Sequence, residues 1–234
     1  MIIHPDLISA VSRRPRNMSF TYGDVKETLL DRREFLQFIG IDYKTLVCAN
    51  QVHGSTVREV SQHDKGKGAL SQDTAIPDTD ALITNVRRLP LAVFTADCLS
   101  IFLYDPLQKA IGLAHAGWRG SKDNIALKTI QLMREKFQVR AENLLVGFGP
   151  ALRSCCYQVG LEFKNYFPAG ISEKDNKMYC DLTGINKKQL LETGVREENI
   201  SDSGICTSCR NDKYFSYRKE ADASGRMISV IMLK

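Results

Sequence analysis

The segment from residue 110 to residue 120 constrains the fold most strongly. Its first half, Ala110-Ile-Gly-Leu-Ala114, is a continuous apolar run, which is typical of a buried strand. Its second half is His115-Ala-Gly-Trp-Arg-Gly120, where glycines flank Trp118 and Arg119 and predict a sharp turn. The chain is therefore expected to leave a buried strand at a histidine and to turn at once.

A helix is predicted to follow this turn. Asp123 is the expected N-cap, and apolar residues recur beyond it at helical spacing, namely Ala126, Ile130, Met133 and Phe137. Arg119 would then stand just before a helix N-terminus, where free N–H groups and the helix dipole favour anions. We expect a functional site here, with core packing of His115 and Trp118 as the competing interpretation.

The composition is that of an ordinary globular protein. Hydrophobic residues make up 43% of the 234 residues and charged residues 25%, so the chain can bury a core. The net charge of +5 is spread along the chain without a basic block, so we expect no nucleic-acid partner. No apolar run suits a membrane span or a signal peptide, and the seven cysteines are irregularly spaced, as reduced thiols often are. A cytoplasmic location is expected.

The remaining patterns predict one domain of mixed α and β structure over residues 1–234. Strands are expected at residues 45–49, 56–60, 80–84, 91–95, 100–104, 144–148 and 226–233. Helices are expected between an N-cap at Asp24 and Gly40, and at residues 161–167 and 185–192. Residues 1–18 are interpreted as a surface arm, and the polar, glycine-rich residues 61–79 as a mobile loop.

Three residues at predicted strand ends form a candidate metal site. His53 and His115 each close an apolar strand close to a glycine, and Cys98 follows a strand and an aspartate. Two imidazoles and one thiolate, with a fourth position left to water, are the pattern of catalytic zinc. There are two alternatives to a metal site. In the first, the three residues are ordinary buried side chains, and in the second, Cys98 and His115 are a nucleophile and its base.

The other cysteine motifs are weaker. Cys206-Thr-Ser-Cys209 is a lone CxxC, which without a second pair is at most half a zinc site, and an accidental pairing is favoured. Cys155-Cys156 is interpreted as packing. The zinc deaminase pattern is absent, because Ser55 stands two residues after His53 where that pattern has glutamate.

Several motifs occur in the order typical of the YfiH-type laccase-domain family, and the chain resembles that family from about residue 17 to residue 234. They are Gln51-Val-His-Gly54, Asp80-Ala-Leu-Ile-Thr84, Ala96-Asp-Cys-Leu99, His115-Ala-Gly-Trp-Arg-Gly120, Gly149-Pro150, Cys206-Thr207, Phe215-Ser-Tyr-Arg218 and Gly225-Arg226. The resemblance implies an α+β fold, a four-layer α-β-β-α sandwich with mixed β-sheets.

The resemblance also implies an activity and a metal. The activity is that of a purine nucleoside phosphorylase acting on adenosine, inosine and methylthioadenosine, with adenosine deaminase as a side activity. Zinc would be bound by the histidine of QVHG, the cysteine of ADC and the histidine of HAGWRG, which are His53, Cys98 and His115 here. Purine nucleosides and phosphate would be the ligands, and a homodimer is compatible with the sequence.

The chain departs from the family pattern at a few positions. Ser100 stands where proline is usual, Gln158 replaces an acidic residue and Lys219 replaces an arginine. A glycine-rich loop ahead of the segment around Asn17 is missing, so we expect a more open site.

Arg119 is the expected holder of phosphate, and Arg218 is a second substrate-binding candidate. Trp118, the only tryptophan, is a third candidate that could stack on the purine, although packing is favoured. The alternatives are a non-enzymatic zinc-binding assembly factor, a phenol oxidase with a single copper ion, and a cysteine hydrolase. A multicopper oxidase is excluded, because four histidines cannot furnish its copper sites.

Overall fold

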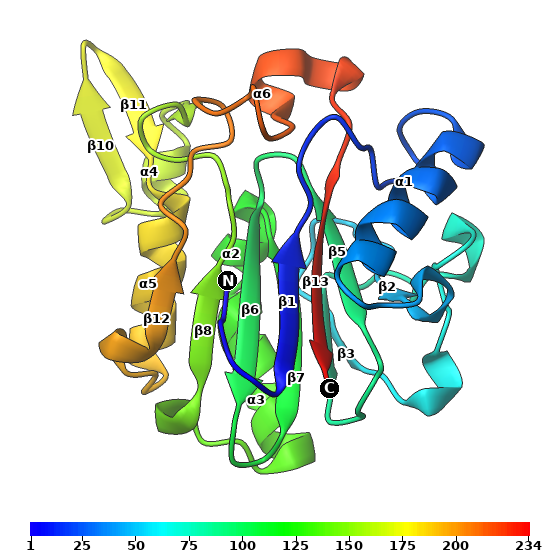
Figure 1. Ribbon diagram of the computed structural model, residues 1–234. Helices are drawn as coiled ribbons and strands as arrows, with labels where there is room; N and C mark the ends of the chain where they lie inside the picture. The colour runs from blue at the N-terminus through cyan, green and yellow to red at the C-terminus, as the bar shows by residue number, and fades with distance from the viewer.

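Two mixed sheets form the centre of the molecule. The computed structural model describes residues 1–234, and Figure 1 shows both sheets with their helices. The larger sheet has six strands in the order β12-β8-β6-β7-β4-β3. Its inner strands pair antiparallel, whereas the edge strands β3 and β12 run parallel to their neighbours. The bounds are β3 (Val57–Glu59), β4 (Ala81–Thr84), β6 (Leu99–Asp105), β7 (Ala110–Ala116), β8 (Leu145–Phe148) and β12 (Ile200–Asp202).

The second sheet has four strands in the order β1-β13-β5-β2. They are β1 (Leu7–Val11), β2 (Val47–Cys48), β5 (Leu91–Thr95) and β13 (Met227–Leu233). β1 pairs antiparallel with β13 along its whole length, so the first and last strands of the chain lie side by side (Figure 1). The prediction of a surface arm for residues 1–18 is therefore wrong. Its partner strand lies at the other end of the sequence, and no local pattern reveals it.

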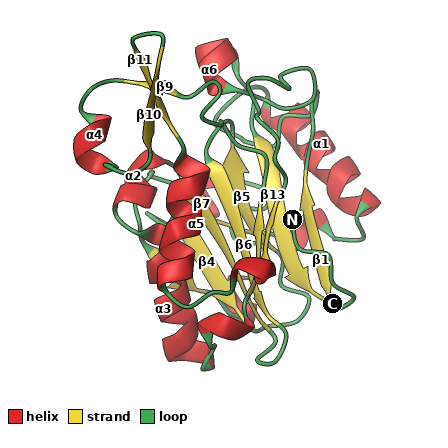
Figure 2. Cartoon of the chain, turned by 90° about the vertical axis from the view of Figure 1, so that its left-hand side faces the viewer, coloured by secondary structure: helices red, strands yellow, loops and turns green.

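Three apolar clusters join the sheets and the helices. One lies between the two sheets, where side chains of β5 and β13 meet those of β6 and β7. A second lies between the six-stranded sheet and α3 (Ile125–Phe137) and α5 (Leu182–Glu192), and a third under α1 (Val25–Phe38) on the four-stranded sheet. Figure 2 shows α3 and α5 on one side of the sheets and α1 on the other. Strands β6 and β7 are buried throughout, which explains their continuous apolar sequence.

Smaller elements complete the chain. A third, antiparallel sheet has the order β10-β11-β9 and consists of β9 (Gln158–Val159), β10 (Ile171–Lys174) and β11 (Lys177–Cys180). The short helices are α2 (Trp118–Lys122), α4 (Phe163–Tyr166) and α6 (Tyr217–Glu220). The 3-10 segments are Tyr43–Thr45, Gln62–Asp64, Gln72–Thr74, Ala141–Asn143, Glu197–Asn199 and Ala221–Ala223. No helix of the structure combines the length and apolar character that crossing a membrane requires.

The predicted helix caps have different outcomes. Asp24 caps α1 as expected, because its side chain accepts hydrogen bonds from the backbone N–H groups of Lys26 and Glu27. The Asp123 prediction is wrong. This residue is the C-cap of the separate helix α2, and α3 starts from Asn124, which adopts a left-handed conformation. The chain therefore forms the short helix α2 and turns at Asn124 before it enters α3.

The glycine-rich stretch at residues 61–79 is packed rather than detached. The backbone N–H of Cys48 donates to the carbonyl of Lys67, and that of Ile76 donates to the carbonyl of Cys48. Gly68 has φ +78°, and a Cβ there would lie 2.6 Å from that of Cys48. Ala69 is fully buried. The stretch therefore covers β2, and its polar composition reflects the turns that it makes.

Candidate metal centre

The structure brings His53, Cys98 and His115 together. His115 lies near the end of β7, Cys98 directly precedes β6, and His53 lies in the loop that follows β2. Their possible ligand atoms all lie within 4.8 Å of one another. The two imidazole rings are edge to face, with centroids 4.8 Å apart. Because β6 and β7 are paired, the cysteine and one histidine are held by the same sheet.

Two side chains shape the loop that carries His53. The Gln51 amide donates to the carbonyl of Phe94 and accepts from the N–H of the same residue, at 2.9 and 2.7 Å, and so fastens the loop to β5. The carboxylate of Asp80 accepts from the backbone N–H groups of Val52, His53 and Gly54. These bonds hold His53 at φ +59°, a conformation that non-glycine residues seldom adopt.

Asp80 also orients His115. Its Oδ1 lies 2.8 Å from Nδ1 of His115, and both side chains are buried. Burial raises the pKa of Asp80, but the bond from His115 and those from the loop outweigh it and leave the pKa below its ordinary value. An ionised carboxylate makes Nδ1 the donor, which leaves Nε2 free as a ligand. Our sequence interpretation gave Asp80 no role, although an acidic residue at the start of a buried strand is a usable signal.

Cys98 and His115 shift each other's pKa. Burial disfavours the Cys98 thiolate, but the charge of His115 and hydrogen bonds from both histidines lower the thiol pKa from 9.0 to about 6. Burial also disfavours charged His115, but the Cys98 charge and the bond to Asp80 raise its pKa from 6.5 to about 9. The sulfur is therefore deprotonated near neutral pH, which is the form that binds a metal.

Gly117 leaves room beside these donors. A Cβ at this position would lie 3.2 Å from the Cys98 sulfur and 3.3 Å from Cδ2 of His53. The glycine therefore keeps the space between the ligands open. Gly120 is required for a different reason, since its Cβ would lie 2.6 Å from the carbonyl oxygen of Gly54. Gly117 thus keeps room beside the metal donors, and Gly120 lets two backbone segments lie close together.

A cavity of about 530 Å³ adjoins the three donors. All the predicted site residues border it, namely His53, Cys98, His115, Trp118, Arg119 and Arg218. Tyr157 and Arg226 also line it, and the sequence did not mark either as a site residue. A concave site of this volume is typical of small-molecule ligands.

Residues 8–234 match the model of a protein family described as multi-copper polyphenol oxidoreductase laccase. The chain belongs to this laccase family. The resemblance to YfiH-type proteins is thereby confirmed, as is the expected α+β fold with mixed sheets.

Relatives within the laccase family cover most of the chain. Purine nucleoside phosphorylase YlmD of Geobacillus stearothermophilus is 33% identical over 92% of this chain and 82% of its own length. Adenosine deaminase RL5, from an unknown prokaryotic organism, is 29% identical over 93% of this chain and 87% of its own. The crystal structure of YlmD from Geobacillus stearothermophilus has a TM-score of 0.94 and 30% identity, covering 98% of this chain and 93% of that chain.

The multi-copper part of the family's description does not fit this laccase-family chain. Only His53 and His115, of four histidines, meet at the candidate centre. His4 accepts from the backbone N–H of Asp6, and His63 belongs to a 3-10 segment. A cluster of several copper ions needs more imidazoles than this site offers.

Trp118 and Arg119 lie together at the cavity wall of the laccase-family chain. The indole ring of Trp118 stacks on Tyr166 at 5.6 Å and 14° and lies 5.3 Å from Phe163, as expected for a packing role. The guanidinium carbon of Arg119 lies 4.5 Å from the centre of that indole ring. Arg119 is exposed and is not among the arginines that form ion pairs. It lies in the first turn of α2, which corrects its expected place just before α3.

Arg218 is more strongly engaged than Arg119. Its guanidinium donates to the carbonyls of Cys156 and Gln158, at 3.4 and 2.9 Å, and its backbone N–H donates to Asp97 at 2.6 Å. Asp97 also accepts from the hydroxyl of Thr207. Arg218 therefore braces the turn that carries Tyr157 while its side chain borders the cavity.

Proposed function

We propose that the protein is a metal-dependent purine nucleoside phosphorylase with adenosine deaminase activity. The observation that carries the proposal is a single cavity bordered by a His-His-Cys donor set and an unpaired arginine. Phosphorolysis needs an anion held against the sugar and a pocket for the base, and the cavity offers both. The names of YlmD and RL5 support the same two activities.

Zinc is the proposed metal. Two imidazoles and one thiolate with space for another ligand match catalytic zinc, and the bond from Asp80 to His115 is the usual outer partner of a zinc-bound histidine. When bound, zinc would supply Lewis-acid chemistry, polarising the base or activating water. The same donors suit a single copper ion, and metal analysis of the purified protein distinguishes the two metals.

Arg119 is proposed as the phosphate holder. Its guanidinium is free of ion pairs, borders the cavity and presents a planar fork that can grip two oxygens. Holding phosphate next to the anomeric carbon lowers the entropic part of the barrier. Arg218 is proposed to position the wall around Tyr157, with direct contact to the substrate as a further role. Trp118 is proposed to shape the pocket by packing on Tyr166.

We also propose a finer description of the fold, the four-layer α-β-β-α sandwich that the resemblance implies. The arrangement of the three apolar clusters supports it. We further propose that residues 1–234 act as one domain, because segments from many parts of the chain line the cavity.

Phosphate dependence tests the proposed function. Phosphorolysis consumes phosphate, whereas deamination consumes water, so purified protein is incubated with inosine or adenosine with and without phosphate. We expect hypoxanthine from inosine only when phosphate is present, and inosine from adenosine in either condition. Strong chelation should abolish both activities and added zinc should restore them.

Three results would contradict the proposal. Inosine cleavage at full rate without phosphate would identify a hydrolase. Loss of only one activity on chelation would mean that the two reactions do not share the His53, Cys98 and His115 centre. Absence of any turnover with zinc-loaded protein would favour a non-enzymatic zinc-binding assembly factor.

A further inference from the structure

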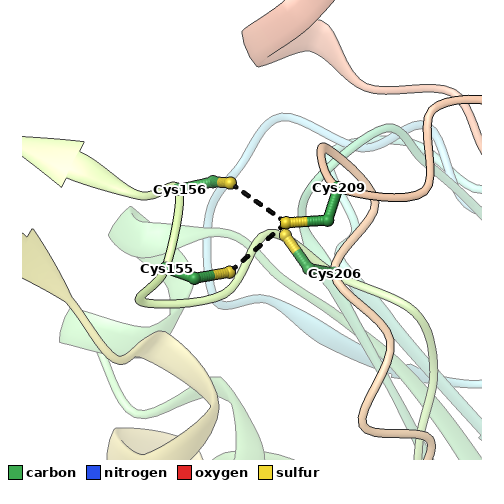
Figure 3. A group of neighbouring side chains, drawn as sticks. All are labelled: Cys155, Cys156, Cys206 and Cys209. Carbon is green, nitrogen blue, oxygen red and sulfur yellow. Dashed lines mark hydrogen bonds between the residues drawn. The ribbon is translucent and has the colours of Figure 1, made fainter.

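A second group of metal-binding side chains lies outside the His-His-Cys centre. Figure 3 shows Cys155 and Cys156 on one turn, facing Cys206 and Cys209 on another. The four sulfur atoms all lie within 4.8 Å of one another. None of the four cysteines is in a disulfide. The CxxC motif therefore has a second pair, and the interpretation of Cys155-Cys156 as packing is corrected.

We propose that Cys155, Cys156, Cys206 and Cys209 bind a structural zinc ion. A tetrahedral zinc with Zn–S distances of about 2.3 Å places neighbouring sulfurs about 3.8 Å apart. The Cys209 sulfur lies 3.7 Å from that of Cys155 and 3.4 Å from that of Cys156, so this half of the group has almost that spacing. Four thiolates are a complete tetrahedral set, as structural rather than catalytic zinc requires.

The backbone around the four sulfurs is built for this geometry. The N–H of Tyr157 donates to the carbonyl of Arg153, and that of Arg210 donates to the carbonyl of Cys206, so each cysteine pair sits in a closed turn. A parallel bridge between Ala151 and Cys206 fixes one turn against the other.

The exposure of the thiols supports a bound ion. Cys155 and Cys209 are exposed and Cys156 is partly exposed, whereas Cys206 is buried. Free thiols at such positions are open to oxidation, whereas zinc-bound thiolates are protected. The ion would join the turn before β9 to the turn after β12, segments with about 50 residues between them.

This zinc would act on the cavity through its wall. Tyr157 follows Cys156 directly and lines the cavity, and Arg218 bonds to the carbonyl of Cys156. Thr207, inside the CxxC motif, bonds to Asp97, which also borders the cavity. The four-cysteine zinc therefore clamps the two turns on which this wall is built, without contacting the substrate itself.

Metal stoichiometry is the first test. Protein purified with zinc and a reductant should contain two zinc ions per chain, and a His53→Ala/His115→Ala variant should keep one. A Cys155→Ser/Cys209→Ser variant should keep the other, and Cys180→Ala, which changes a buried cysteine outside the group, should keep both. Retention of a single zinc by wild type, lost entirely in the double-histidine variant, would overturn the proposal.

Thiol labelling gives a second test that does not depend on any variant folding. Zinc-loaded wild type is treated with iodoacetamide and mapped by peptide mass spectrometry, before and after chelation. Cys155 and Cys209 should be unlabelled with zinc and rapidly labelled without it, while buried Cys180 stays unlabelled in the folded protein. Rapid labelling of Cys155 and Cys209 in the zinc-loaded protein, or a disulfide between any of the four cysteines in it, would overturn the proposal. Neither test measures nucleoside turnover, so failure here is distinct from failure of the proposed activity.

Discussion

The carboxylate of Asp80 illustrates how much one residue organises in this protein. It receives three backbone N–H bonds from the QVHG loop and one bond from His115. One side chain thus fixes the position of His53 and the ring orientation of His115. The Cys98 charge and this contact raise the pKa of His115, and charged His115 in turn lowers that of Cys98. The reactivity of the Cys98 thiol therefore depends on the contacts among Asp80, His115 and Cys98, and it can be measured.

The pH dependence of Cys98 alkylation follows from these shifts. In metal-free protein, the rate of iodoacetamide labelling at Cys98 should rise through about pH 6 instead of pH 9, because the thiolate forms early. Cys48 is the control, since it is buried and burial also raises its thiol pKa to about 11, so it should stay unlabelled over the whole pH series. Peptide mapping over a pH series measures both residues. Labelling of Cys98 at an equal rate with zinc present would instead support the cysteine hydrolase interpretation.

Arg119 is the residue on which the phosphate site depends. Arg119→Lys keeps the charge but removes the planar fork, so kcat/KM for phosphorolysis should fall at least about tenfold, or about 1.4 kcal/mol. Deamination of adenosine should be unaffected, because it uses no phosphate. Arg134→Lys, on the exposed surface of α3, is the matched control. An unchanged phosphate dependence in Arg119→Lys would show that the anion binds elsewhere.

At the scale of elements, α1 is attached by an unusual contact. The apolar side chains of this region are only partly buried as a group, and Leu30 is 56% exposed; they are Leu29, Leu30, Phe35, Leu36 and Ile39. The fully buried face includes Arg32, whose guanidinium donates to the carbonyls of Met18, Gly68 and Ala69. Its charge also lies over the rings of Phe20 and Phe94, at 3.9 and 4.7 Å. One arginine thus joins α1 to two loops and to β5.

Replacing this arginine should weaken the attachment of α1. Arg32→Met leaves three buried carbonyls without their donor, so the free energy of unfolding should fall by at least about 3 kcal/mol. Arg33→Met, one position along and exposed, should change it by less than about 0.5 kcal/mol. Urea unfolding monitored by circular dichroism measures both variants. Equal losses for the two would mean that the bonds from Arg32 to the three buried carbonyls do not stabilise the fold.

The whole molecule has a core that does not depend on the His-His-Cys centre. The two largest apolar clusters lie between the sheets and under α3 and α5, and the metal donors belong to neither. Burial of apolar area in a chain of this size is sufficient for a stable fold. The candidate catalytic metal is therefore expected to be dispensable for folding.

Alanine at a ligand position tests this independence. His53→Ala, Cys98→Ala and His115→Ala should each lose the zinc of the His-His-Cys centre while far-ultraviolet circular dichroism and cooperative unfolding persist. Metal analysis and thermal unfolding, compared with zinc-loaded wild type, measure the two properties. Unfolding of all three variants at room temperature would make the site structural, and the catalytic interpretation would then fail.

The sequence by itself determined the buried strands and the local ends of elements. Continuous apolar runs at residues 91–95, 100–104 and 110–114 have no stable position outside a core, and the carboxylate of Asp24 caps α1 through local N–H groups. The meeting of His53, Cys98 and His115 was also expected, because each lies at a predicted strand end and the family resemblance implies this ligand set, but it is the packing of the two sheets that brings them together. The strands and the helix cap depend on residues that are near in sequence or on burial alone.

Only the tertiary structure decided the features that join distant segments. The pairing of β1 with β13, the bonds of Asp80 to the QVHG loop, and the meeting of Cys155 and Cys156 with Cys206 and Cys209 are of this kind. Each links residues that are far apart in the sequence, so no helical or strand periodicity and no single turn connects them. Their free energy comes from burial and hydrogen bonds that exist only once the sheets have packed, so no local pattern encodes them.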